Sequence, residues 1–307
     1  MPVAAPTPSP GSHPLTARTA LAVATAVAAM LLYAGQFVVT RWSIQRTLSL
    51  WDLAALRFTV AGLVLLPVVL RFGIADAAGV GWGRALVLGA AAGAPYTLVL
   101  FAGLTFAPAA HGAVIIPGVT PVVAIVLAWW WFGQRPRVTT GLGLAGIVVG
   151  LVLVGWPGLS GHDRTWLGDA LFVVAGVLWA LFTVLARRWQ VDPLRGPAMV
   201  WVTALAYVPV YGLLAGGRLA QAPLGEVLFQ AVYQGLGVAV GALTLYAWAI
   251  RVLGSSVASL FMPLVPIFGV LLAVPVLGEL PSAVQWVGIA AVSAGMVLAA
   301  ARPAAAA

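Results

Sequence analysis

The sequence predicts an all-α polytopic membrane protein in which ten transmembrane helices form two inverted repeats of five. Three observations support this fold class. Of the 307 residues, 63% are hydrophobic and only 7% are charged, whereas about a quarter of the residues of a soluble domain are charged. The apolar runs are long enough to cross a bilayer, which takes about 20 residues per helix. One passage also recurs 145 residues later along the chain.

The apolar runs can be assigned as ten spans. They are expected at residues 19–40, 52–70, 84–105, 109–131, 138–156, 167–187, 197–215, 226–249, 255–277 and 281–301. The first run could be a signal peptide, but Arg18 is its only basic flank and nine further runs follow. We therefore expect a retained helix. The connecting loops are too short to hold a separate domain.

The predicted spans divide the chain into five parts. Residues 1–18, rich in proline, alanine and serine, are expected to be a disordered cytoplasmic N-terminus. The other parts are a first five-helix repeat at 19–156, a periplasmic linker at 157–166, a second five-helix repeat at 167–301 and a cytoplasmic tail at 302–307.

The repeat itself is seen most clearly between residues 109–150 and 254–295, which align without a gap. The matched positions include Pro121 with Pro266, Gly133-Gln134 with Gly278-Glu279, Pro136 with Pro281, Gly143 with Gly288, and Gly150 with Gly295. Each half contains an odd number of crossings, so the second half enters the membrane from the opposite side. The two halves are therefore related by a pseudo-two-fold axis in the membrane plane, as in many transporters.

Several other classes of protein fit the sequence poorly. The net charge of +8 comes from scattered arginines and not from a basic patch, so no nucleic-acid partner is expected. There are no cysteines, and we expect no metal and no cofactor. An enzyme is not expected because catalytic motifs and paired intramembrane acids are absent. A channel would need a polar-lined pore. A channel or a non-transporting scaffold remains the alternative from a different class.

Arginine distribution predicts the orientation in the membrane. With a cytoplasmic N-terminus, ten arginines flank the spans on the inside and five on the outside. Cytoplasmic loops are usually enriched in basic residues. Both termini are therefore expected in the cytoplasm of a bacterial cell, with the protein in the inner membrane.

Tryptophans support the predicted boundaries. Twelve of the 13 lie at or near span ends, where indole rings anchor at the headgroup level. Of these twelve, Trp201 lies deepest, one turn inside its span. Trp179 is the exception, because it falls near the middle of the sixth span. A role at the interface is not possible there.

Three segments of this sequence resemble the drug/metabolite transporter superfamily, of the EamA-like type. They are the pattern Leu53-Ala54-Ala55-Leu56-Arg57-Phe58, the Pro121 helix ending in Phe132-Gly133-Gln134, and the Pro266 helix ending in Leu277-Gly278-Glu279. The layout is most similar to the bacterial amino-acid exporter branch, which includes aromatic amino-acid exporters. Gln134 departs from the family pattern, in which glutamate is usual at that position.

The resemblance implies both a fold and a function. The third, fourth, eighth and ninth helices would line a central cavity, with contributions from the first and sixth. The protein would be a secondary transporter that exports small metabolites, in the first place aromatic and other neutral amino acids, by alternating access. An exporter of another metabolite or drug class is the alternative. An oligomer is not required.

Helix-breaking residues occur in the same four spans. They are Pro95 in the third, Pro117 and Pro121 in the fourth, Gly235, Gly237 and Gly241 in the eighth, and Pro263 and Pro266 in the ninth. A proline leaves a backbone carbonyl without its helical partner, which is costly in lipid. The alternative for any one of them is a packing kink. The symmetric positions of Pro121 and Pro266 favour a hinge.

Polar and aromatic residues within the spans are the candidates for substrate binding. We select Tyr33, Gln36, Tyr96, His111, Trp179, Gln234 and Tyr246. Aromatic rings near mid-depth can contact an apolar side chain, and amides or His111 can hydrogen-bond a carboxylate or amine. The alternative for each is a helix-to-helix hydrogen bond, worth under about 1 kcal/mol. Arg57, five residues inside its span, fits either a snorkelling anchor or a gate.

The positions of the acids bear on energy coupling. Asp52, Asp169, Glu226 and Glu279 all lie at span ends, and His111 is the only titratable group away from them. Proton-driven transporters usually carry intramembrane carboxylates. Facilitated diffusion or exchange is therefore predicted in preference to carboxylate-based proton antiport.

The topology can be tested with reporter fusions. A fusion at Pro303 should report a cytoplasmic location, and one within residues 157–163 should report a periplasmic location, because the arginine bias places these segments on opposite sides. Paired phosphatase and fluorescent-protein reporters make the measurement. The reverse pattern would contradict the prediction.

Overall fold

The computed structural model describes residues 17–133, 135–160, 164–214 and 218–300. Over these ranges the chain is helical without strands, and ten segments are long and apolar enough to cross a membrane. The predicted fold class and the number of spans are confirmed. Residues 1–16 and 301–307, which hold most of the two predicted tails, lie outside the described residues, as does Gln134.

Five spans form the first half of the chain. They are α1 (Ala17–Ile44), α2 (Leu50–Phe72), α3 with α4 (Trp82–Ala92 and Ala94–Phe106), α5 (Ala109–Phe132) and α6 (Val138–Ser160), with the short turn η1 (Ala77–Gly79) after α2. Helix α6 continues past Trp156 to Ser160, so helix occupies the start of the segment expected to be a linker.

Five further spans form the second half. They are α7 (Thr165–Arg188), α8 with α9 (Arg195–Ala204 and Tyr207–Leu214), α11 with η2 and α12 (Leu224–Gln230, Ala231–Ala242 and Leu243–Leu253), α13 with α14 (Ser255–Ser259 and Leu264–Leu277) and α15 (Ala283–Ala300). The short helix α10 (Arg218–Gln221) precedes α11.

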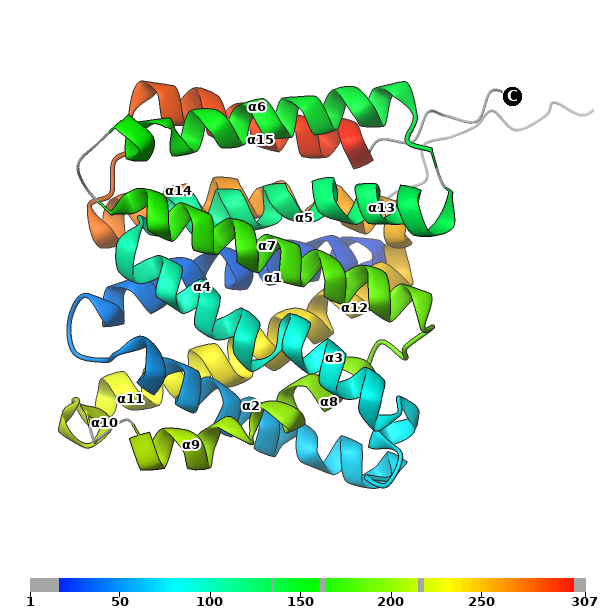
Figure 1. The fold of residues 1–307 in the computed structure, drawn as a ribbon, viewed down its shortest axis with the longest axis vertical. Helices are drawn as coiled ribbons and strands as arrows, with labels where there is room; N and C mark the ends of the chain where they lie inside the picture. The colour runs from blue at the N-terminus through cyan, green and yellow to red at the C-terminus, as the bar shows by residue number, and fades with distance from the viewer. Residues whose placement is uncertain (1–16, 134, 161–163, 215–217, 301–307) are drawn as a thin grey trace, which may run out of the picture.

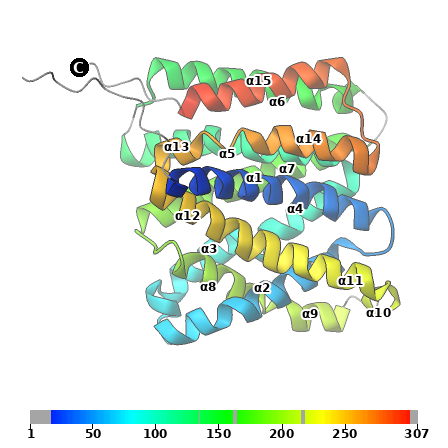
Figure 2. The same ribbon diagram turned by 180° about the vertical axis from the view of Figure 1, so that it is seen from behind.

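The spans lie side by side in stacked layers (Figure 1). Helices α6 and α15 form one outer layer, α5 and α14 the next, and α2 with α8 and α9 lie at the opposite side of the stack. Helix α1 lies in the middle, packed on α14 on one side and on α12 and η2 on the other (Figure 2). Helix α7 runs opposite to α1, as expected for inverted halves.

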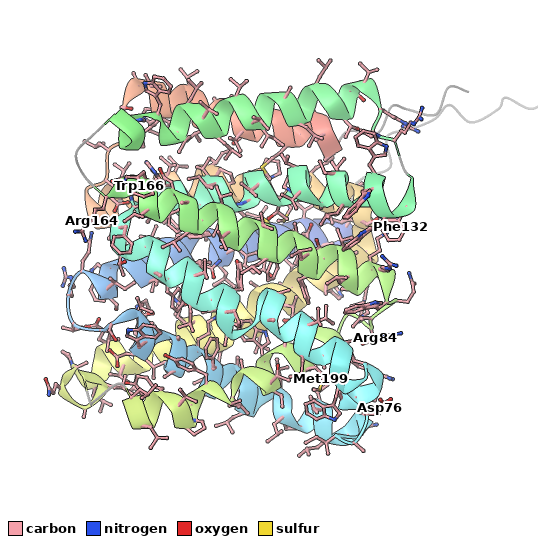
Figure 3. All side chains as sticks on the ribbon, viewed as in Figure 1. Asp76, Arg84, Phe132, Arg164, Trp166 and Met199 are labelled. Carbon is pink, nitrogen blue, oxygen red and sulfur yellow. The ribbon has the colours of Figure 1, made fainter. Side chains whose placement is uncertain are left out.

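We name the two ends of the bundle by their relation to the chain termini. The start of α1 and the end of α15 lie at the proximal end. Phe132 and Arg84 lie at this end, and Arg164 and Trp166 lie at the opposite, distal end (Figure 3). The exposed aromatic residues Trp82, Trp130, Trp166 and Trp286 lie at or near helix ends, as expected for interfacial anchors.

The helix-breaking residues have different outcomes in the four spans. The third span is interrupted at Gly93, and Pro95 occupies the first turn of α4. The eighth span widens into the π-helical segment η2, which contains all three glycines. The ninth is interrupted after Ser259, with Pro263 capping α14.

The break expected in the fourth span is absent. Helix α5 runs unbroken through Pro117 and Pro121. The fixed φ of proline is itself compatible with a helix, and α7, α14 and α6 all pack against α5 and support its helical path. The two halves therefore differ in backbone at this repeated position.

The matched glycines of the repeat meet where α6 crosses α15. A β-carbon at Gly143 would lie 2.7 Å from the Gly295 carbonyl oxygen, and one at Gly150 would lie 2.6 Å from the Gly288 carbonyl oxygen. The reciprocal contacts at Gly295 and Gly288 are equally close. Glycine thus allows the two backbones to touch, which is the usual mode of close packing in membranes.

This crossing generates a stability prediction. Gly143→Ala should lower the unfolding free energy by about 1–3 kcal/mol, because its β-carbon would meet backbone atoms that cannot move aside. Gly141→Ala on the same helix is the control, since nothing lies within 4 Å of its β-carbon position. The measurement is unfolding in detergent by circular dichroism. Equal stability of the two variants would contradict the proposed backbone contact.

Candidate substrate site

Arg57 points into the protein. It lies seven residues after the start of α2, about 10 Å from the distal end of that helix, and is only 4% exposed. Its Nη1 donates to Gln36 Oε1 at 3.0 Å and, at the longer distance of 3.5 Å, to Gln234 Oε1. The interpretation of Arg57 as a snorkelling anchor is therefore wrong, because interior acceptors hold the guanidinium.

The two glutamines that face Arg57 come from different spans. Gln36 lies on α1, and Gln234 lies on the π-helical segment η2. The Gln234 Nε2 donates to Thr40 Oγ1 at 2.7 Å, which turns the amide oxygen toward the guanidinium. π-Helical backbone is rare and frequently occurs at functional sites. The η2 segment that carries Gln234 is π-helical over twelve residues.

Aromatic rings surround these polar groups. The ring centroids of Tyr96 and Trp179 are 5.1 Å apart, and those of Trp179 and Phe182 are 5.3 Å apart. Arg57 lies 4.9 Å from the ring of Trp201 and 5.9 Å from that of Phe101. Trp201 is consequently 6% exposed. The prediction that Trp201 belongs to the interfacial belt is wrong, because it packs on Arg57.

Six of the seven predicted substrate-binding residues lie on Arg57 contacts or on the helices that supply them. Gln36 and Gln234 accept from Arg57, Tyr33 lies three residues before Gln36 on α1, Tyr96 lies on α4 with Phe101, Trp179 packs on Tyr96, and Tyr246 lies on α12, which packs on α1. We call this set the central cluster; its members are Arg57, Tyr33, Gln36, Tyr96, Trp179, Gln234 and Tyr246. They come from five spans, so the cluster depends on the complete fold.

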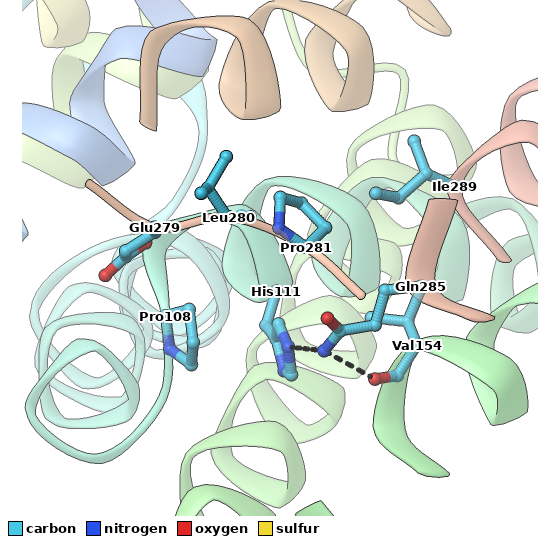
Figure 4. A pocket seen from close by; sticks show the side chains of 9 residues that line it. Pro108, His111, Val154, Glu279, Leu280, Pro281, Gln285 and Ile289 are labelled. Atoms are coloured by element: carbon cyan, nitrogen blue, oxygen red, sulfur yellow. Dashed lines mark hydrogen bonds between the residues drawn. The ribbon is translucent and has the colours of Figure 1, made fainter. Parts of the chain in front are cut away.

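His111 lies elsewhere, at the distal end. Its Nδ1 is 2.7 Å from Asp169 Oδ1. Its Nε2 is 2.7 Å from Gln285 Nε2, a contact that Figure 4 shows. Because an amide nitrogen can only donate, this arrangement puts the imidazole proton on Nδ1, where it is donated to Asp169. His111 thus joins α5 to α7 and α15 and makes no contact of this kind with the central cluster.

A second polar contact closes the same end. Gly278 ends α14 in the left-handed conformation, with φ of 70°, which glycine adopts readily. The next residue, Glu279, accepts a hydrogen bond from the Ala109 backbone N–H at 2.8 Å and pairs with Arg41. Arg41 also donates to the Leu104 carbonyl at 2.6 Å. A carboxylate is favourable at the N-terminus of α5.

These groups form one layer, which we call the distal clamp: Arg41, His111, Asp169, Glu279 and Gln285. A cavity of about 130 Å³ lies beside it, lined by Pro108, His111, Glu279, Pro281 and Gln285 among others (Figure 4). The clamp ties the ends of α1, α4, α5, α7, α14 and α15 together.

The other two membrane-end acids predicted from sequence also have partners at the distal end. Asp52 accepts from Ser49 and Tyr211, and Glu226 accepts from Ser43 at 2.6 Å and Thr47 at 2.5 Å. Within the described ranges, no group of three histidine or acidic side chains could hold a metal ion.

The candidate hinges Pro121 and Pro266 lie on α5 and α14. These helices pack together closely, since a β-carbon at Gly269 of α14 would lie 2.3 Å from the Ala113 side chain of α5. Pro266 is buried and Pro121 is half-buried. A hinge role for the pair stays a prediction.

Five partners in these two sites were not selected from the sequence. They are Thr40, which bonds to Gln234 of the central cluster, and Arg41, Asp169, Glu279 and Gln285 in the distal clamp. Asp169 and Arg41 looked like ordinary charged residues at span ends. For Arg57 the sequence did give a signal: it is an arginine inside a predicted span, and no acidic residue is predicted at a similar depth in the membrane.

The fold and the site can now be compared with known proteins. Two stretches, residues 20–156 and 166–301, match the EamA-like transporter family. The chain belongs to this family. The two matched stretches of this EamA-like protein correspond to the first five and last five spans.

Two relatives illustrate the likeness of this EamA-like protein to others. An uncharacterized transporter of Archaeoglobus fulgidus is 24% identical over 277 residues, covering 88% of this chain and 93% of that protein. A solved crystal structure is 21% identical and has a TM-score of 0.60 over 91% of this chain and 96% of that one. The solved structure supports the fold alone. The EamA-like protein is therefore a multi-pass membrane transporter.

The site generates a prediction for Trp179. Trp179→Ala should reduce transport at least about fivefold, because it removes the ring that contacts both Tyr96 and Phe182. Trp286→Ala is the control, since Trp286 is 45% exposed near the distal end of α15. Flux in liposomes is measured after confirming insertion of both variants. Equal activity of the two variants would remove Trp179 from the site.

Proposed function

We propose that this EamA-like transporter exports aromatic and other neutral amino acids across the bacterial inner membrane by alternating access. The observation that carries the proposal is the central cluster, where an aromatic surface meets buried amides and hydroxyls in the middle of the bundle. An amino acid presents the same combination, an apolar side chain beside a small polar head.

The parts of the central cluster have distinct roles in this proposal. The ring of Trp179 lies 5.1 Å from that of Tyr96 and 5.3 Å from that of the adjoining Phe182, and these rings form the contact surface for the side chain. Gln36 and Gln234 are 6% and 0% exposed and supply hydrogen bonds to the head group. Desolvated polar groups favour a ligand that satisfies them over one that does not.

The distal clamp has the role of a gate. We assign the distal end to the periplasm and both termini to the cytoplasm, in keeping with the arginine bias. In the present conformation the Arg41–Glu279 pair and the His111–Asp169 pair hold the distal ends of the spans together. Release of substrate to the periplasm then requires both pairs to separate, while the central cluster stays between the two ends.

Transport by facilitated diffusion or exchange fits the placement of the acids. In the part of the chain that the structure describes, the central cluster contains no carboxylate, and the acids of α2, α7 and α11 bond to partners at the distal end. A proton carrier near the substrate would need such a group.

The test is efflux from liposomes. Purified protein should release preloaded labelled phenylalanine and leucine down their gradients, and an imposed pH step should change the rate little compared with the substrate gradient. A panel that adds glutamate, arginine and a quaternary ammonium drug as matched compounds establishes the substrate class. Failure to release any amino acid while the drug is released would contradict the proposal.

His111→Ala provides the control for coupling. A histidine side chain can carry a proton, and His111 is bonded to Asp169 in the distal clamp. Any weak dependence of the rate on pH should therefore be lost in His111→Ala. Strong accumulation driven by the pH gradient that persists in this variant would contradict uncoupled transport, because it would require a different proton carrier.

A further inference from the structure

We propose that Arg57 binds the carboxylate of the substrate, so that this transporter selects monocarboxylates and zwitterions over cations. This inference rests on the proposed function only in taking the central cluster as the transport site. It adds Arg57 to the residues that bind substrate, and it predicts selection by substrate charge, which the aromatic and amide groups alone do not provide.

The first argument is the missing counter-ion. Arg57 is 4% exposed, and among the described residues neither the Arg41–Glu279 ion pair nor the His111–Asp169 hydrogen bond involves it. An arginine remains charged inside a protein. A buried charge is normally paired, because its loss of hydration is costly. In the described part of the chain, the guanidinium of Arg57 therefore has no carboxylate partner.

The second argument concerns hydrogen bonds. The bonds of the guanidinium in the structure come from one nitrogen, Nη1, to the neutral oxygens of Gln36 and Gln234, and the second of these is 3.5 Å long. Its Nε is buried with no hydrogen-bond partner. The rings of Trp201 and Phe101 contact the group but offer no acceptor of this kind. A guanidinium has five donors arranged to bind a carboxylate through two oxygens.

The third argument is charge balance. Among the described residues, every other arginine lies at a span end or in a connecting segment, so Arg57 contributes a single positive charge to the interior. One carboxylate would neutralise it. A dianion would leave a buried negative charge, and a cation would be repelled. The site thus favours a single carboxylate.

The neighbouring rings place the remainder of such a ligand. Arg57 lies 5.9 Å from the ring of Phe101, which is on the same helix as Tyr96, and the ring of Tyr96 lies 5.1 Å from that of Trp179. A carboxylate on Arg57 would therefore have its apolar part directed toward the aromatic surface. The Gln36 and Gln234 oxygens that now accept from Arg57 would give way to the carboxylate oxygens.

A purely structural arginine would behave differently. If Arg57 served to brace α1 and η2, its replacement by glutamine would destabilise the protein and leave ligand preference unchanged. If it is a binding group, Arg57→Gln removes an uncompensated buried charge. The melting temperature (Tm) without ligand should then stay level or rise, and the stabilisation by carboxylates should be lost.

The experiment compares three probes that share a benzyl group. They are phenylalanine, 3-phenylpropanoate, which lacks the amine, and phenylalaninamide, which lacks the carboxylate. Binding is measured on the full-length protein in detergent by ligand-dependent Tm and by calorimetry. Wild type should bind the two carboxylates and discriminate against the amide. Arg57→Gln should weaken carboxylate binding by roughly 30-fold or more, the usual effect of truncating one partner of a buried charge pair.

Arg57→Lys is the second variant. It keeps the charge but lacks the planar fork, so it should retain the preference for carboxylates at lower affinity. This variant keeps the test decisive if Arg57→Gln fails to fold. Loss of carboxylate preference in the lysine variant would then contradict a charge-based site.

The outcomes separate this inference from the proposed function. Binding of 3-phenylpropanoate but not phenylalanine, lost in Arg57→Gln, supports the role of Arg57 and contradicts amino-acid export. Equal binding of phenylalanine and its amide by wild type overturns the role of Arg57. Unchanged carboxylate binding in Arg57→Gln overturns it as well. Absence of binding by all three probes overturns both.

Discussion

In hydrocarbon, every backbone N–H and C=O must find its partner within the protein, and this constraint organises the whole chain. Ten helices are the direct result. Where the backbone departs from a regular helix, neighbouring helices must shield its polar groups from lipid. The π-helical segment η2 packs on α1 and α2, and its Gly235 lies so near Val60 that a β-carbon would be 2.4 Å from that side chain. The irregular backbone of η2 thus lies at contacts between spans, where Gln234 of the central cluster also lies.

The same constraint applies to charge, and the structure distributes charge unevenly. The acids of the described spans lie at the distal end with bonded partners, whereas Arg57 remains in the interior with neutral ones. A soluble protein could hydrate such a group through a small movement of its surface. In a bilayer such hydration is not possible, so the guanidinium of Arg57 stays without a counter-ion. A solute that carries a carboxylate can supply one. In the proposed site, the same desolvated charge would account for both the selection of the solute and its entry into the bundle.

Sequence alone predicts what depends on composition and spacing. The number of spans follows from apolar runs, and the matched glycines and prolines of residues 109–150 and 254–295 reveal the repeat. Arg57 and Trp201 could not be oriented, because a small rotation of a helix with apolar residues all round decides between lipid and interior. His111 is bonded to Asp169, which is 58 positions away along the chain, and to Gln285, which is 174 positions away. Only the packing of α5, α7 and α15 brings these residues together. The unbroken path of α5 through Pro121 likewise depends on its neighbours.

The glycine crossing of α6 and α15 has a consequence for motion. The repeat relates Gly143 to Gly288 and Gly150 to Gly295, while the contacts join Gly143 to Gly295 and Gly150 to Gly288. Exchanging the two halves therefore converts each contact into the other, which puts the crossing on the pseudo-two-fold axis. A contact with this property is preserved when the halves swap conformations. In the proposed alternating-access cycle, helices α6 and α15 are therefore expected to keep their mutual packing while the other eight spans change position.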